Sequence, residues 1–265
     1  MTLQLLICTL DGGIENIADL LLEPREGVSY LVSWQHSDRA TRELPAELKR
    51  ADVEVIELEG RGLSRNRNNC INHASGDVCL LCDDECRYDH NELNALVLTF
   101  ATNLKLDIGT FKARGVNIEY PARSFNLNES ASGYFAISFT IAFRRSSVQG
   151  RLAFNENFGL GAPELLCGEE ELFIYDAKQL GLNCVYYPAF VVTHVGGETT
   201  TTKMVAHPGT LKARGAFLAI AYNDTKYRRA VLIAYRLHRD RGIGFFHALK
   251  NILKGIKMGK KAHAS

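Results

Sequence analysis

The chain has 265 residues, of which 46% are hydrophobic and 23% charged, as in an ordinary soluble globular protein. This length allows one large α/β domain with a small appendage. No stretch of about 18 apolar residues occurs, so we expect no transmembrane helix. Residues 3–8 are apolar but too short for a secretory signal, and a cytoplasmic protein is expected. The seven cysteines are scattered without the spacing of a zinc site, so we expect reduced thiols.

Charge is distributed unevenly along the chain, although the net charge is only +1. Residues 203–265 hold 14 lysines and arginines against two acids and carry +12, whereas residues 1–202 carry −11. This asymmetry predicts that the C-terminal part meets an anionic partner.

The first third of the chain alternates predicted strands and helices. Strands are expected at residues 3–8, 30–33, 53–58 and 78–82, and helices at 14–22, 44–51 and 64–73. Such alternation is typical of right-handed crossovers in a mostly parallel sheet.

The middle of the chain is less regular. Helices are expected at residues 93–100 and 169–180, strands at 107–112, 134–143, 184–187 and 190–193, and a loop over a site at 113–133. Gly181 predicts the end of the second helix, and Pro188 is expected to divide the last two strands.

The last 60 or so residues have a helical pattern. Apolar residues from Phe245 to Ile256 recur on one helical face and lysines on the other, which predicts a basic amphipathic helix. This helix either lies on an anionic membrane surface through residues 243–261 or packs on the remainder of the protein. Nucleic-acid binding is not expected, because few aromatic residues are interleaved with the basic ones.

Three acids, Asp83, Asp84 and Glu85, directly follow the predicted strand at 78–82. Ligands bind at the carboxyl ends of strands in open α/β sheets, and clustered acids repel one another unless a cation compensates. Carboxylate oxygens suit Mg²⁺ or Mn²⁺, and such an ion could hold a diphosphate. The alternative is a solvated acidic turn.

A second polar segment, residues 62–68, opens a predicted helix with glycine, a serine cap and two arginines. Free N–H groups and Arg67 at this position favour contact with an anion. Solvated arginines on a surface helix are the alternative reading.

Three glutamates, residues 169–171, begin a later helix, and His194 ends a later strand. One glutamate could be a general base for an acceptor hydroxyl, although acids also favour helix starts through the dipole. A lone histidine is more often structural than a ligand, so the position of His194 alone decides little.

The order of these segments resembles the inverting family-2 glycosyltransferases of GT-A fold. The carrying motifs are Gly62-Leu63-Ser64-Arg65-Asn66-Arg67-Asn68, Gly76-Asp77, the acids at 83–85, Gly168-Glu169-Glu170 with Phe173, and His194. Their shared order across residues 3–194 is a far stronger signal than any single motif.

This resemblance implies an α/β chain with a single-domain, Rossmann-like mixed sheet of GT-A type and a helical C-terminal extension. Residues 1–202 would form the catalytic domain, with a nucleotide-binding half (1–86) and an acceptor-binding half (87–202), followed by the extension at 203–265.

The resemblance also implies roles for individual residues. Thr9, Gln35, Arg67 and Asp83 would bind the donor, Asp84, Glu85 and His194 would hold Mn²⁺ or Mg²⁺, and Glu170 would be the catalytic base. Three departures from the family stand out. Residues 8–11 read Cys-Thr-Leu-Asp, and Gln35 replaces the aspartate that usually contacts the base of the nucleotide. The side chain of Glu170 is one methylene longer than that of the family's catalytic aspartate. An amide at position 35 can still pair with a uracil edge, while Trp34 either stacks on the base or packs in the core.

The implied function is transfer of a sugar from a nucleotide-diphosphate donor, with UDP favoured, to a glycan or lipid-linked acceptor in bacterial surface polysaccharide synthesis. The alternative is a non-catalytic GT-A module that binds a nucleotide sugar or glycan. A sugar nucleotidyltransferase and a Rossmann dehydrogenase are excluded, because residues 11–13 lack the glycine-rich loops that those enzymes need.

Overall fold

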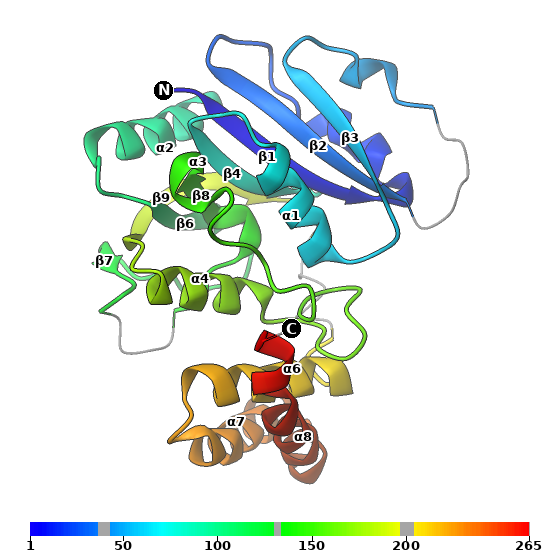
Figure 1. Ribbon diagram of the computed structural model, residues 1–265, viewed down its shortest axis with the longest axis vertical. Helices are drawn as coiled ribbons and strands as arrows, with labels where there is room; N and C mark the ends of the chain where they lie inside the picture. The colour runs from blue at the N-terminus through cyan, green and yellow to red at the C-terminus, as the bar shows by residue number, and fades with distance from the viewer. Residues whose placement is uncertain (37–42, 130–133, 197–203, 265) are drawn as a thin grey trace. The chain divides into compact units, whose positions relative to one another are not determined.

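The computed structural model describes residues 1–36, 43–129, 134–196 and 204–264 (Figure 1). The described residues divide into two compact units. Unit 1 comprises Met1–Arg61, Arg65–Ala153 and Asp176–Gly197, and unit 2 comprises Gly62–Ser64, Phe154–Tyr175 and Glu198–Ser265. Unit 2 therefore combines the C-terminal helices with residues 154–175, which the sequence places in the acceptor-binding half.

One mixed sheet organises unit 1. In the described part of the chain its order is β3-β2-β1-β4-β8-β6-β9-β5, with β7 beside β9. The strands are β1 (Leu3–Leu10), β2 (Val28–His36), β3 (Val53–Glu59), β4 (Val78–Asp83), β5 (Cys86–Arg87), β6 (Ile108–Arg114), β7 (Phe125–Asn126), β8 (Ile141–Arg144) and β9 (Cys184–His194). The first four run parallel to one another, whereas β8 is antiparallel to both β4 and β6.

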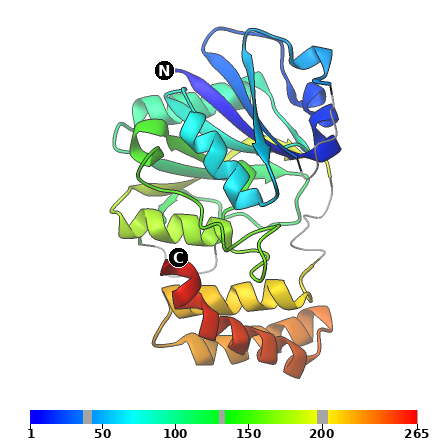
Figure 2. The same ribbon diagram turned by 45° about the vertical axis from the view of Figure 1, so that its right-hand side comes forward.

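The central parallel strands β1 and β4 are mostly apolar and buried, as expected of strands covered on both faces. Leu5 of β1, Ile17 of the 3-10 helix η1 (Asp11–Leu20) and Leu93 of α2 (His90–Thr102) belong to the same buried core. Helix α1 (Leu63–His73) lies over one face of the sheet in both views (Figures 1 and 2). Two shorter helices, η2 (Ala46–Leu48) and α3 (Arg145–Val148), complete the connections.

The predicted α/β fold with a mixed sheet is confirmed, and the four N-terminal strands form where they are expected. The prediction of one strand across residues 134–143 is wrong, because Ser138–Thr140 form the 3-10 turn η3 and only Ile141–Arg144 pair in the sheet.

The expected break of the last strand at Pro188 is also wrong. Strand β9 continues through the proline, because its pairing with β6 shifts register between Tyr186 and Phe190. A bulge of this kind spares Pro188 the ladder hydrogen bond that it cannot donate. The predicted helix at 169–180 is confirmed as α4 (Glu169–Gln179), and Gly181 follows it with a φ of +74°.

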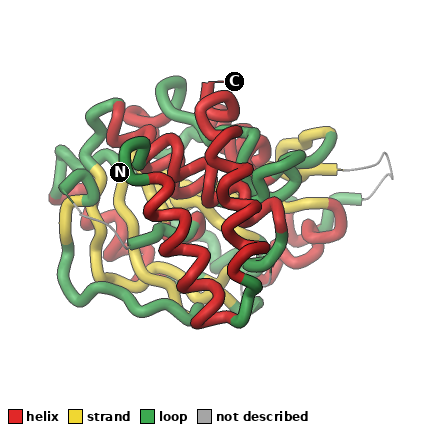
Figure 3. Tube along the Cα trace, turned by 90° about the horizontal axis from the view of Figure 1, so that it is seen from below, coloured by secondary structure: helices red, strands yellow, loops and turns green. Residues whose placement is uncertain are grey.

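Unit 2 is helical, as the C-terminal pattern predicts. Its long helices are α6 (Pro208–Ala221), α7 (Lys226–Arg241) and α8 (Phe245–Ala264), and Figure 3 shows the last two side by side. Ala248, Ile252 and Ile256 bury the apolar face of α8 in a core shared with α6 and α7. Among the described residues, none of the helices combines the length and the hydropathy that crossing a membrane requires.

Glycines bring α6 and α8 unusually close together. A Cβ atom on Gly255 would lie 1.8 Å from the carbonyl oxygen of Lys212, and one on Gly215 would lie 1.9 Å from that of Ile252. Only glycine permits such backbone contact between two helices.

Candidate active site

The carboxyl ends of three parallel strands meet beside helix α1. In the register of the sheet, Cys8 of β1 pairs with Asp83 of β4, and Leu10 of β1 pairs with Gln35 of β2. This is the edge at which open α/β sheets bind ligands. All four donor-binding residues expected from the sequence, Thr9, Gln35, Arg67 and Asp83, belong to unit 1.

Thr9 and Asp84 are joined directly. The Thr9 hydroxyl donates a 2.8 Å hydrogen bond to Asp84 Oδ2. Gly13 approaches both groups so closely that a Cβ atom would lie 2.4 Å from each of the two oxygens. Residue 13 must therefore be glycine for the loop after β1 to close over this pair.

Burial raises the pKa of Asp84 above its ordinary value, and the carboxylates of Asp83 and Glu85 raise it further. The hydrogen bond from Thr9 acts in the opposite direction, because it stabilises the ionised carboxylate. An acid in this environment gains from any cation that approaches it.

Arg67 of α1 lies fully inside unit 1 and faces Asp83. Its guanidinium is 2% exposed, and its Nη2 atom is 3.6 Å from Asp83 Oδ1. The buried Ser138 hydroxyl approaches Asp83 Oδ2 at 3.4 Å. The guanidinium is thus held at the strand ends, where its fork could reach a phosphate.

Asn66, which replaces the alanine usual in the resembling family, also takes part. Its Nδ2 atom donates a 3.1 Å hydrogen bond to the backbone carbonyl of Thr9. Asn66 and Ser138 are the two residues at this site that the sequence did not single out as functional. For Asn66 the signal was its place in the motif at residues 62–68, and Ser138 had none.

The side chain of Gln35 is buried, and the NH₂ group of its amide lacks a hydrogen-bond partner among the residues that the structure describes. Within the described part of the chain, its Nε2 atom has no hydrogen-bond partner, although the side chain is only 2% exposed. An orphaned buried donor of this kind is costly and suits a ligand acceptor. Trp34 packs in the core and donates from Nε1 to the Asp11 carbonyl at 2.9 Å, so the core interpretation of this ring holds.

Glu85 and His194 come together because β5 pairs with the end of β9, where Cys86 faces His194. Glu85 Oε2 and His194 Nε2 are 3.4 Å apart, and the imidazole stacks on Phe139 at 5.0 Å. Carboxylate and imidazole are suitable ligands for Mn²⁺, and this spacing fits two neighbouring ligands of one ion.

A larger protein-only metal site is not found. Among the described residues, no three or more His, Cys, Asp or Glu side chains are grouped to hold a metal ion. Asp84 is therefore not assembled with Glu85 and His194, and its role as a ligand stays a prediction.

The three glutamates belong to unit 2, at the first turn of α4. Gly168 precedes them with a φ of +87°, which favours glycine. Glu169 is buried beside Gly159, whose Cβ atom, if present, would lie 3.1 Å from the Glu169 carboxyl carbon. Glu170 is partly buried, and its role as the catalytic base stays a prediction.

The carboxyl of Glu171 has a perturbed pKa. Burial raises its pKa from 4.5 to about 7, and the neighbouring Glu170 carboxylate contributes, while Arg214 of α6 opposes the shift. The sequence predicts that the base needs a raised pKa and assigns it to Glu170. A raised pKa is found at Glu171, and the assignment of the base to Glu170 stays a prediction.

Comparison with known proteins identifies the class. The model of the glycosyl transferase family 2 matches residues 15–153, which is more than half of the chain. The chain belongs to this family, and the predicted family and GT-A fold are thereby confirmed. Among curated proteins, none matches the chain.

Solved structures of TarS from S. aureus are similar in fold. The structure of residues 1–349 with UDP has a TM-score of 0.61 at 14% identity and covers 99% of this chain and 86% of its own. The same part with UDP-GlcNAc has a TM-score of 0.61 at 15% identity and covers 100% and 83%. A longer TarS structure has a TM-score of 0.57 at 15% identity and covers 90% of this chain, which spans only 43% of it. The chain is a glycosyltransferase of GT-A fold.

Proposed function

We propose that this chain transfers a sugar from UDP to a hydroxyl of a glycan or lipid-linked acceptor, with inversion at the anomeric carbon. The observation that carries the donor assignment is the buried Arg67, held beside Asp83 at the carboxyl ends of β1 and β4. The similar TarS structures are complexes with UDP and with UDP-GlcNAc, which supports a UDP donor.

Gln35 would read the base. Its Nε2 atom is a buried donor without a partner among the described residues, and a uracil carbonyl would supply the missing acceptor. Thr9 would lie beside the nucleotide, because Asn66 and Asp84 fix both its carbonyl and its hydroxyl. Arg67 would stabilise negative charge on the departing diphosphate.

Glu85 and His194 would hold Mn²⁺ or Mg²⁺, with Asp84 as a further ligand. Their oxygen and nitrogen donors suit these ions, and the Glu85–His194 separation of 3.4 Å is compatible with joint ligation. When bound, such an ion offsets charge on the diphosphate leaving group.

Glu170 would remove the proton from the acceptor hydroxyl, so that a single displacement inverts the anomeric centre. We further propose that the protein acts in bacterial surface polysaccharide synthesis. It would work in the cytoplasm and contact the membrane peripherally through residues 243–261. The exposed lysines of α8, Lys250, Lys254 and Lys257, support the membrane contact, because such side chains bind anionic headgroups.

The test is hydrolysis of UDP-sugars in water with and without Mn²⁺, together with UDP-induced thermal stabilisation. We expect metal-dependent release of UDP, and Glu170→Gln should keep UDP binding while turnover falls by about 10²-fold or more. Full turnover by Glu170→Gln would remove this residue from the role of base. UDP binding without any sugar release from wild-type protein would favour a non-catalytic nucleotide-sugar module instead.

A further inference from the structure

The outer side of helix α7 exposes apolar and aromatic side chains at helical spacing. Tyr227, Val231 and Tyr235 recur every four residues and are 60%, 49% and 51% exposed. Large apolar side chains that are exposed together along one helical face commonly mark a site of interaction with a partner. The neighbouring side of α7 is already used, because Ala230 and Ala234 pack in the core of unit 2.

Basic side chains border this apolar line. Arg228, Leu232 and Arg236 form the next line along α7, and all three are exposed. The only acid in α7 is Asp240, which is paired with Arg239. Cationic and aromatic groups are therefore combined on one face, without competing acids.

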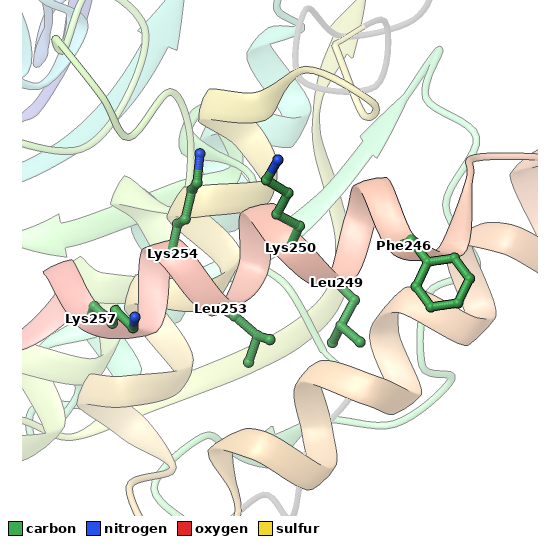
Figure 4. Close-up of a pocket in the computed structure, with 6 residues that line it drawn as sticks. All are labelled: Phe246, Leu249, Lys250, Leu253, Lys254 and Lys257. Carbon is green, nitrogen blue, oxygen red and sulfur yellow. The ribbon is translucent and has the colours of Figure 1, made fainter.

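Helix α8 continues the pattern beside α7. Phe246 is 82% exposed at its first turn. An open groove of about 510 Å³ follows, lined by Phe246, Leu249 and Leu253 together with Lys250, Lys254 and Lys257. Figure 4 shows the three apolar side chains on one side of α8 and Lys250 and Lys254 on another. The deeper apolar residues, Ile252 and Ile256, are buried in the helical core and are not available to a partner.

We propose that the exposed residues of α7 and α8 named above, the α7–α8 surface, dock on an anionic phospholipid bilayer. This inference deepens the proposed function, on which it rests for the lipid-linked acceptor. It also changes the expected mode of membrane contact. The apolar face of α8 is buried and does not insert into the bilayer; instead, the exposed line of Tyr227, Val231 and Tyr235 on α7 inserts together with Phe246.

Charge and shape together favour a bilayer over other occupants. Tyrosine and phenylalanine insert at the headgroup boundary, and lysine and arginine bind anionic headgroups. A nucleic acid would satisfy the cations but leave Val231, Leu232 and Phe246 bare. A protein partner would have to cover many lysines, which are depleted at protein interfaces.

The experiment is flotation of the full chain with vesicles of phosphatidylcholine alone or mixed equally with phosphatidylglycerol. Wild-type protein should float with the mixed vesicles and not with phosphatidylcholine. Tyr227→Ser with Val231→Ser and Tyr235→Ser should reduce the bound fraction about tenfold. Arg228→Gln with Arg236→Gln, Lys250→Gln and Lys254→Gln should reduce it at least as strongly, at roughly fivefold for each lost charge.

The control is Leu98→Ser with Leu104→Ser, which removes from unit 1 two apolar residues that are at least as exposed as those of α7. This variant should float like wild type. Equal flotation of wild type and the tyrosine variant, or equal flotation with both vesicles, would overturn the proposal. A dimer in sedimentation that the tyrosine variant abolishes would instead assign the surface to a second copy and also overturn it.

UDP-induced thermal stabilisation without vesicles separates this proposal from the proposed function. Surface variants should keep it unchanged, because they lie outside the nucleotide site. Loss of UDP binding by wild type would count against the donor assignment, whatever the flotation result.

Discussion

The hydroxyl of Thr9 at the end of β1 and the carboxylate of Asp84 after β4 form a 2.8 Å hydrogen bond across 75 positions of sequence. This bond links two neighbouring strand ends at the proposed donor site. It also supplies a neutral donor to a carboxylate whose pKa is raised by burial.

Replacing Thr9 by valine keeps the shape of the side chain and removes this donor. Asp84 would then be a buried acceptor with a lost partner, so we expect the free energy of unfolding to fall by about 1–2 kcal/mol. UDP affinity should fall as well, because the loop after β1 loses its tie to β4. Chemical denaturation and UDP titration measure both effects. Thr9→Ser restores the hydroxyl and should recover most of each loss; failure to do so would assign the effect to packing.

Gln35 offers a test in which stability and binding change in opposite directions. Gln35→Leu removes an unsatisfied buried donor, so the free protein should unfold at an equal or higher denaturant concentration. UDP affinity should fall roughly tenfold, the equivalent of one lost hydrogen bond.

Gln4 is the matched control for Gln35. It is also a buried glutamine, but its amide is bonded to Ser75 and to the backbone of Gly76. Gln4→Leu should therefore destabilise the protein by about 2 kcal/mol and leave the intrinsic affinity for UDP intact. A Gln35→Leu protein that loses stability and keeps its UDP affinity would contradict the role of Gln35 at the base.

Strands β1 and β4 could be predicted from the sequence because they contain short apolar runs followed by polar residues. Strand β4 (Val78–Asp83) is an example, since five apolar residues lead directly into the acids. The split expected at Pro188 failed because a register shift in the β6–β9 pair is a tertiary feature that no local pattern records. The strand expected over residues 134–143 failed because its alternation is equally compatible with the turn at Ser138–Thr140.

The site shows the same limit. Motif order pointed to Arg67 and Asp83, and the structure brings these two together at 3.6 Å. Ser138 has no motif of its own, and its approach to Asp83 arises only because β8 is inserted beside β4. The raised pKa of Glu171 depends on packing around the first turn of α4, so sequence position alone could not predict it.

The packing of α6 against α8 predicts an unusual sign for a glycine substitution. In an exposed helix, Gly→Ala stabilises by about 1 kcal/mol. Gly255→Ala should instead destabilise by about 2 kcal/mol or more, because its Cβ atom would lie 1.8 Å from the Lys212 carbonyl oxygen. Thermal unfolding measures the change, with the exposed Lys257→Ala on the same helix as the control. A more stable Gly255→Ala protein would mean that the two helices do not approach this closely.

Glu171 predicts a pH-dependent change in stability. Its pKa is about 7 in the folded protein against 4.5 in the unfolded chain. Between pH 4.5 and pH 7 the folded protein therefore keeps a proton on this carboxyl that the unfolded chain has lost. The stability contributed by the protonated side chain is complete below pH 4.5 and is lost as the pH rises through 7. Glu171→Gln removes the charged form, and it should therefore match wild type at pH 4 and exceed it above pH 7 by up to about 3 kcal/mol.

The matching control is Glu47→Gln, an exposed glutamate of unit 1, which should run parallel to wild type at every pH. Urea unfolding between pH 4 and pH 8.5 measures all three proteins. A constant difference between Glu171→Gln and wild type across this range would mean that the carboxyl titrates normally. Glu171 would then be poorly suited to accept a proton at neutral pH, because a general base works best when its pKa lies near the working pH.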